Sequence, residues 1–129
     1  MSIKDGDTYI LNVGDRAFTF KINVLISPSG RQKGLSGHSG LPSGTGILFI
    51  FDTLSYQSMW MPDMKFALDI VWLDENMTVV NINYNTPPCV SRDACVSYES
   101  VYLVKYAIEM TAGDAKTYGF NIGTTVTIK

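Results

Sequence analysis

Charged residues are scarce in this chain, and their scarcity limits the partners that it can bind. Asp, Glu, Lys and Arg make up 17% of its 129 residues, and the formal net charge at pH 7 is -2. A nucleic-acid-binding surface needs a concentration of positive charge, so we expect no nucleic-acid partner. Hydrophobic residues reach 46%, which is typical of a compact globular protein rather than a disordered one.

Long apolar runs are also missing. No segment approaches the ~18 consecutive apolar residues of a membrane helix, and the N-terminus has no basic stretch followed by an apolar one. We therefore expect a soluble, cytoplasmic protein with no membrane partner. The length fits a single domain over residues 1–129 that buries roughly two thirds of its unfolded surface on folding.

Histidine and cysteine are too few to indicate a metal or cofactor site. His38 is the only histidine, and it lies in a Gly/Ser-rich segment over residues 34–46 that we interpret as a connecting loop. A Ser-His-Asp or Cys-His mechanism would have to use this residue, although an exposed loop histidine is the simpler interpretation. Cys89 and Cys95 share a Pro-containing loop. A disulfide, two free structural thiols and a redox or metal role all remain open for this pair.

Apolar and polar residues alternate through most of the chain, which predicts β-strands. The predicted strands cover residues 9–13, 17–26, 47–51, 58–61, 68–73, 80–84, 104–110 and 124–128. Two short helices are expected, at residues 29–35 and at residues 112–118, where Gly119 ends the second. The predicted fold class is mainly β with two short helices, as a compact β-barrel or sandwich-like single domain.

The candidate site residues are polar groups beside aromatic ones. Trp60 and Asp63 precede the apolar strand that contains Asp69. In one interpretation these side chains pack and cap turns. In the other, Trp60 forms one wall of a pocket in which Asp69 is buried or is held ionised by Arg31. Glu109 should face solvent or a second layer of strands, with an alternative in which it pairs with Asp69 for hydrolytic chemistry.

Several short motifs occur in a specific order between residues 31 and 126, and together they resemble an uncharacterised bacterial and archaeal family, domain of unknown function 192. The matching residues are Arg31, Gly34 and Leu35; Leu41 and Pro42; Gly46, Leu48, Phe49 and Phe51; Trp60 and Met61; Leu68, Asp69, Ile70, Leu73 and Asp74; Pro88, Cys89, Cys95 and Tyr98; and Glu109, Ala112, Gly113, Gly119 and Gly123. The resemblance implies a fold but no established activity, and members of the family are often exported.

The chain departs from the family pattern at two places. It has Pro62-Asp63 where the family usually has Lys-Asn, and Gly123-Thr124 where the family usually has Gly-Asp. The first difference removes a cationic side chain beside Trp60.

These observations favour a small binding or accessory module with a pocket near the Trp-Met and Leu-Asp motifs. Its ligand would be a small polar molecule or a protein segment. The ligand-binding candidates are Arg31, Trp60, Asp63, Asp69 and Glu109. One alternative is a hydrolase that uses Asp69 with Glu109 or His38, and another is a structural module within an assembly. The sequence leaves the oligomeric state open.

Overall fold

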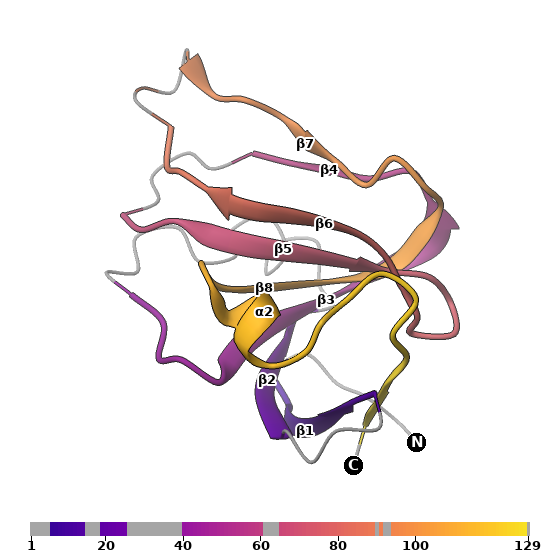
Figure 1. Cartoon of the computed structure of the whole chain (residues 1–129). Coiled ribbons are helices and arrows are strands. Elements are labelled where there is room, and N and C mark those ends of the chain that lie inside the picture. Colours follow the sequence, from indigo (N-terminus) through magenta and orange to yellow (C-terminus); the bar gives the residue numbers. More distant parts are fainter. Residues whose placement is uncertain are drawn as a thin grey trace.

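The computed structural model describes residues 6–14, 19–25, 40–60, 65–89, 91 and 94–128. This described part of the chain contains nine strands and one short helix (Figure 1). They are β1 (Thr8–Val13), β2 (Thr19–Leu25), β3 (Thr45–Ser55), β4 (Ser58–Met59), β5 (Leu68–Leu73), β6 (Val79–Thr86), β7 (Tyr98–Glu99), β8 (Val104–Thr111), α2 (Asp114–Thr117) and β9 (Val126–Ile128). The prediction of a mainly β fold is confirmed.

Seven of the strands form one sheet in the order β6-β5-β8-β3-β2-β1-β9, and β4 pairs separately with β7. All neighbouring strands are antiparallel except β2 and β3, which run parallel. The predicted strand pair at residues 9–13 and 17–26 corresponds to β1 and β2. The predicted helix at residues 29–35 falls outside the described residues.

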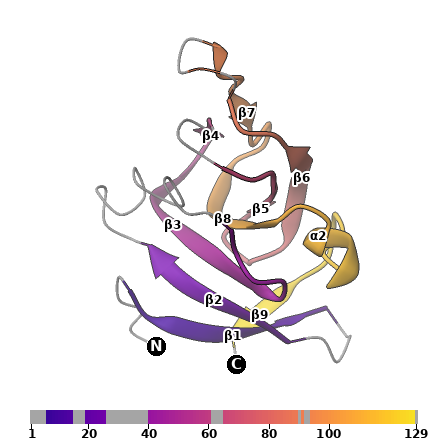
Figure 2. The ribbon, with the colours of Figure 1, turned by 90° about the vertical axis from the view of Figure 1, so that its left-hand side faces the viewer.

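The large sheet is strongly curled, as the rotated view shows (Figure 2), and its two edge strands, β6 and β9, approach each other only where they begin. Just before the first edge strand, β6, Thr78 forms a bridge with Thr125, which precedes the other edge strand, β9. The backbone N–H of Val79 donates to the carbonyl of Thr124 at 2.8 Å, and that of Val126 donates to the carbonyl of Met77 at 2.9 Å. The sheet is therefore closed at one end, which agrees with the barrel-like architecture that the sequence predicts.

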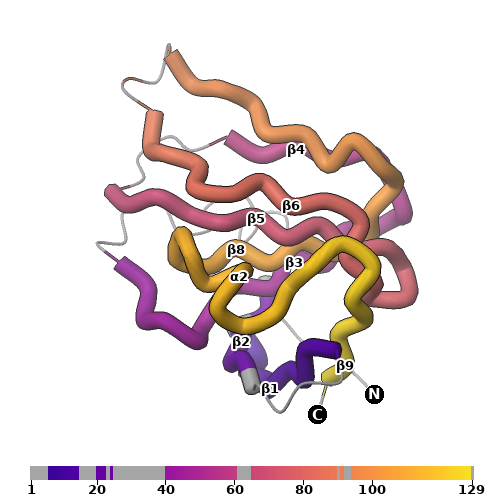
Figure 3. The backbone as a smooth tube through the Cα atoms, viewed as in Figure 1, coloured from indigo at the N-terminus to yellow at the C-terminus, as the bar shows by residue number. Residues whose placement is uncertain are grey.

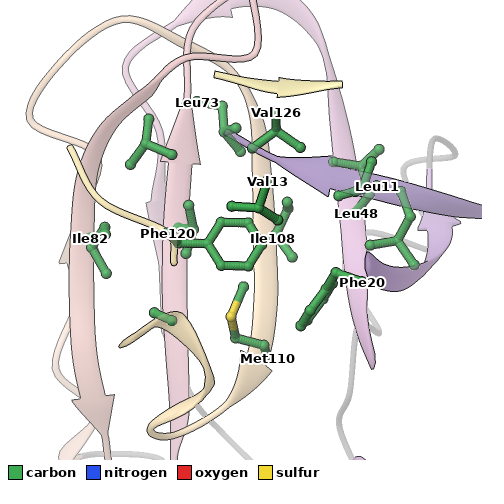
Figure 4. Close-up of a cluster of buried hydrophobic side chains, with 14 of the residues drawn as sticks. Leu11, Val13, Phe20, Leu48, Leu73, Ile82, Ile108, Met110, Phe120 and Val126 are labelled. Atoms are coloured by element: carbon green, nitrogen blue, oxygen red, sulfur yellow. The ribbon is translucent and has the colours of Figure 1, made fainter. Parts of the chain in front are cut away.

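The inside of the curl holds the larger hydrophobic cluster, which we call the inner cluster. Phe120 lies near its centre, between Ile82 and Ile108 (Figure 4). Its ring meets that of Phe20 edge to face, with centroids 5.3 Å apart. The inner cluster consists of Leu11, Val13, Phe20, Ile22, Val24, Leu48, Val71, Leu73, Val79, Ile82, Ile108, Met110, Ala115, Phe120 and Val126.

A second cluster, the outer cluster, covers the opposite face of β3, β5 and β8. Met59 of β4 and Tyr98 of β7 pack against it, so the two-stranded sheet lies over this face. These three strands are therefore buried on both faces, which explains why β5 reads as a continuous apolar run except for Asp69. The outer cluster consists of Ile47, Phe49, Phe51, Leu68, Ile70, Trp72, Val104 and Ala107.

The helix α2 lies against β5 and β8 (Figure 3). It is shorter than the predicted helix at residues 112–118, although Gly119 follows it with φ 81°, as expected for a glycine at the end of a helix. The strand predicted at residues 47–51 is also longer than expected, because β3 continues to Ser55.

The alternation predicted for Val80, Ile82 and Tyr84 is wrong in part. Ile82 is buried, but Val79 joins it in the inner cluster and Tyr84 is exposed. The cause is a β-bulge, because Trp72 pairs with Asn81 and the next residue, Leu73, pairs with Val79. Val80 is the extra residue, and it packs against the outer cluster instead.

Candidate functional site

Asp69 is a buried carboxylate with three backbone hydrogen bonds. The N–H of Asn85 donates to Oδ1 at 2.8 Å, and the N–H groups of Gly113 and Ala115 donate to Oδ2 at 2.9 and 3.0 Å. The side chain therefore joins the end of β6 to the start of α2. This arrangement matches the capping interpretation of Asp69, and it engages both carboxylate oxygens within the fold.

Asp114 acts in a similar way, and no local sequence pattern indicated this role. Its side chain is buried, accepts from the Ser43 hydroxyl at 2.9 Å and accepts from the N–H of Gly44 at 2.9 Å. It thereby attaches α2 to the segment that leads into β3. An aspartate in the first turn of a short helix normally reads as a solvated cap, so only tertiary contacts could have identified this role.

Glu109 is the buried carboxyl group with the most unusual surroundings. Its neighbours along β8, Ile108 and Met110, belong to the inner cluster, so its side chain points to the opposite face. There its cross-strand partners are Ile47 of β3 and Ile70 of β5, both in the outer cluster. The sequence-based expectation that Glu109 faces solvent or a second strand layer is resolved in favour of the second layer.

The Glu109 side chain is only 6% exposed, and none of the described residues donates a hydrogen bond to its carboxylate. Burial raises the pKa of this carboxyl group to about 7, because the charged form loses its hydration. The group therefore exchanges a proton near neutral pH. In its ionised form it can hold a cation or accept a hydrogen bond, and in its neutral form it can also donate one.

Asp69 and Glu109 do not form a carboxylate pair. Asp69 lies opposite Met110 on the inner face of the sheet, whereas Glu109 lies opposite Ile70 on the outer face. Side chains on opposite faces of a sheet cannot share a water molecule for hydrolysis. The structure therefore gives no support to a hydrolase that uses these two groups together.

Trp60 lies on the outer side of the sheet. It follows β4, whose Met59 packs on the outer cluster, and its own side chain is 53% exposed. Trp60 and Asp69 are thus on opposite sides of the sheet, while Trp60 and Glu109 share the outer side. Arg31, Asp63 and His38 fall outside the described residues, so their places in a pocket stay predictions.

Trp72 is a structural residue of the outer cluster. It is fully buried, and its indole N–H donates to Oδ1 of Asn83 at 2.7 Å. The neighbouring Asn81 donates from its side chain to the backbone carbonyl of Ser100 at 3.2 Å. These amide side chains connect β6 to the outer cluster and to the chain that follows β7, a role that the alternating pattern alone did not indicate.

Cys89 and Cys95 form a disulfide, with Cα atoms 4.8 Å apart. Cys89 also packs against the outer cluster. In the described part of the chain, no three His, Cys, Asp or Glu side chains gather in a way that could hold a metal ion. The one described helix, α2, is too short to cross a membrane.

The fold and the site define a small, mainly β domain with a curled seven-stranded sheet and a buried carboxyl group on the outer face that accepts no hydrogen bond from the described residues. The family model DUF192, described as "Uncharacterized ACR, COG1430", matches residues 9–128. The chain belongs to this family. No curated protein matches the chain.

Two crystal structures have the same fold. A proposed transcription regulator from Sinorhizobium meliloti 1021 superimposes with a TM-score of 0.87 and 22% sequence identity, over 98% of each chain. A protein of unknown function from Novosphingobium aromaticivorans DSM 12444 gives a TM-score of 0.81 and 20% identity, over 92% of this chain and 83% of the other. At these identities the comparisons show the fold alone.

Proposed function

We propose that this protein is a small binding module whose site lies on the outer face of the sheet, with Glu109 as its central polar group. The observation that carries the proposal is the buried Glu109 carboxyl group, which has apolar cross-strand neighbours and no donor among the described residues. An ionisable group in such a place costs stability, and a ligand that pairs with it would offset that cost.

Asp69, in contrast to Glu109, has a purely structural role in this fold. It accepts three backbone hydrogen bonds and links two segments. Glu109 links nothing in the described chain. We therefore leave Asp69 out of the proposed site, and retain Trp60 on the same side of the sheet together with the sequence-based candidates Arg31 and Asp63.

The surroundings of Glu109 favour a small polar ligand with a cationic or hydrogen-bond-donating group. Ile47 and Ile70 flank the carboxyl group, and Trp60 offers an exposed aromatic surface on the same side. An amine that carries a short apolar group would satisfy both features, because its charge pairs with the carboxylate and its carbon atoms replace water on the apolar wall. A lysine side chain of a protein segment has the same chemistry.

NMR titration with n-butylamine, putrescine, adenosine and a lysine-containing tetrapeptide tests this proposal. We expect an amine to shift signals of Ile47, Ile70 and Glu109, and we expect Glu109→Gln to weaken that binding at least tenfold. Glu75→Gln is the matched control, because Glu75 is exposed in the turn before β6. Equal amine affinity in the parent and in Glu109→Gln would show that Glu109 is not part of the site. If none of the four compounds shifted any signal, the proposal of a binding module of this kind would be wrong.

A second candidate, a module within a protein assembly, is favoured by a group of exposed apolar side chains. Leu54 and Tyr56 lie at and beyond the end of β3, beside the segment Val101, Tyr102 and Leu103 that leads into β8. Their exposed fractions run from 42% to 71%. Val101 also has φ 68°, a strained conformation for a β-branched residue.

Analytical ultracentrifugation over a wide concentration range tests the second candidate. Self-association that Tyr56→Ser and Tyr102→Ser abolish, with unchanged thermal stability, would support an assembly role for this surface. A monomer at every concentration would contradict self-assembly.

A further inference from the structure

A groove of about 530 Å³ lies where the end of β1 meets β9 and the loop before it. Its size is in the range of small-molecule sites, which is roughly 300 to 1,000 Å³. The lining residues are Val13, Gly14, Gly119, Asn121, Gly123, Thr124, Thr125 and Thr127. No member of the outer cluster takes part, so the groove is separate from the site proposed around Glu109.

Glycines keep the groove open. Gly14, Gly119 and Gly123 all have positive φ values, of 62°, 81° and 92°. At Gly14 a Cβ atom would come within 3.2 Å of Cγ2 of Thr124, a side chain that also lines the groove. Backbone in this conformation favours glycine, so these three positions contribute main-chain surface without side chains that would fill the space.

The polar groups that the described residues contribute to the lining are all neutral, and several of them form no hydrogen bond within this part of the chain. In the described part of the chain, no hydrogen bond uses the hydroxyl groups of Thr124 and Thr127 or the Oδ1 atom of Asn121. By contrast, the Thr125 hydroxyl pairs with that of Thr78 at 3.1 Å, and Asn121 Nδ2 donates to the carbonyl of Gly119 at 3.3 Å. The groove therefore presents two hydroxyl groups and one amide oxygen from adjacent segments.

We propose that this groove binds a neutral, polyhydroxylated small molecule of the size of a monosaccharide. Threonine hydroxyls both donate and accept hydrogen bonds, as do the hydroxyl groups of a sugar, so the two sets can pair in several orientations. A charged ligand would lose hydration without meeting an opposite charge from the described residues, because no Asp, Glu, Lys or Arg among them lines the groove. A flat aromatic ligand would find no ring on which to stack among the described lining residues.

The test compares three sugars that share one ring and differ in charge. The 15N-labelled protein is titrated with glucose, glucuronate and glucosamine, and amide signals are followed by NMR. We expect glucose to shift the signals of Gly14, Gly119, Gly123 and Thr124 in a saturable way at millimolar concentrations. Glucuronate and glucosamine should bind several-fold more weakly.

Variants then test which groups hold the sugar. The double variant Thr124→Val/Thr127→Val keeps the shape of both side chains and removes the two hydroxyl groups. Since a neutral hydrogen bond contributes on the order of fivefold in affinity, we expect at least a tenfold loss. Thr53→Val is the matched control, because Thr53 is exposed on β3 away from the groove. If the double variant unfolds, Thr127→Val alone should still lose on the order of fivefold.

Several outcomes would overturn the proposal. They are the absence of saturable shifts with glucose, equal binding of the charged sugars, unchanged affinity in the hydroxyl-deleted variants, or shifts confined to Ile47, Ile70 and Glu109. The last of these would place the ligand at the outer-face site instead, so failure of one proposal leaves the other intact.

Discussion

Two buried carboxyl groups on neighbouring strands differ in what their surroundings let them do. Asp69 meets three backbone N–H groups, so its negative charge is compensated inside the fold. Glu109 meets two isoleucines across the sheet, so its charge is not compensated by any described residue. The first group holds two segments of the fold together, whereas the ionised form of the second destabilises the native state.

The raised pKa of Glu109 predicts a specific pH dependence of stability. Its folded pKa of about 7 lies above the ordinary 4.5, so the folded state binds the proton more tightly than the unfolded state. The resulting stabilisation is complete below pH 4.5 and is lost as the pH rises through 7. In Glu109→Gln this dependence should disappear.

Urea unfolding of the parent and of Glu109→Gln at several pH values measures this effect. The parent should lose up to roughly 3 kcal/mol relative to the variant between pH 4.5 and pH 8. Titration of the other carboxyl groups affects both proteins equally and cancels in the difference. A pH-independent difference between the two proteins would show that Glu109 has an ordinary pKa.

Neutralising Asp69 should have a large effect on stability at neutral pH. Asp69→Asn replaces one acceptor oxygen with an NH2 group that faces backbone donors, so at least one buried N–H loses its partner. We expect a loss of about 3 kcal/mol in the free energy of unfolding. Glu75→Gln, at an exposed turn position, should change it by less than about 0.5 kcal/mol. Similar values for the two variants would contradict the structural role of Asp69.

The sequence predicted the identity of these residues better than their roles. Burial of Asp69 followed from its position inside an apolar strand, and its capping role was one of two interpretations. The separation of Asp69 from Glu109 depends on the pairing register of β5 with β8, because a shift of one residue would place both on the same face. Register is a property of two distant segments, and no local pattern specifies it.

At the scale of secondary-structure elements, β3 is the middle strand of the seven-stranded sheet. It pairs with β2 on one side and with β8 on the other, and Gly46 lies where the three strands approach one another. A Cβ atom at Gly46 would lie 2.7 Å from Cε1 of Phe20 and 2.8 Å from the backbone oxygen of Glu109. One of these neighbours is main chain, so it cannot simply rotate away.

Gly46→Ala should therefore destabilise the protein by about 1 to 3 kcal/mol. Gly40→Ala provides the matched control, since a Cβ atom there would meet nothing within 4 Å. That variant should remain within about 1 kcal/mol of the parent, with a small gain possible from the reduced freedom of the unfolded chain. Chemical denaturation measures both values, and an equal effect of the two substitutions would mean that β3 can move away from β8.

Sequence patterns located the long strands well and the irregular parts of the sheet poorly. The predicted limits of the strand at residues 68–73 agree with β5, because a strand buried on both faces has a continuous apolar signal. The bulge at Val80 and the two-residue strand β7 were not predicted. Both depend on contacts with other segments, since β7 exists only through its pairing with β4.

For the molecule as a whole, the three strands that are buried on both faces, β3, β5 and β8, couple the two hydrophobic clusters. Leu48 and Phe49 of β3 are consecutive residues that belong to the inner and the outer cluster, and Val71 and Trp72 of β5 are another such pair. When one of these strands separates from the inner cluster during unfolding, it must also separate from the outer cluster. The clusters should therefore unfold together in one cooperative transition, although they lie on opposite faces of the sheet.

The two tryptophans make this prediction measurable. In a Trp60→Phe background, Trp72 is the only tryptophan and reports on the outer cluster, while far-ultraviolet circular dichroism reports on the whole sheet. We expect the urea midpoints from the two signals to coincide. Leu11→Ala, which changes only the inner cluster, should lower both midpoints equally, by an amount that corresponds to about 2 to 5 kcal/mol. If Trp72 fluorescence changed at a lower urea concentration than the circular dichroism, the outer cluster would be a separate unfolding unit, and coupling through β3, β5 and β8 would be wrong.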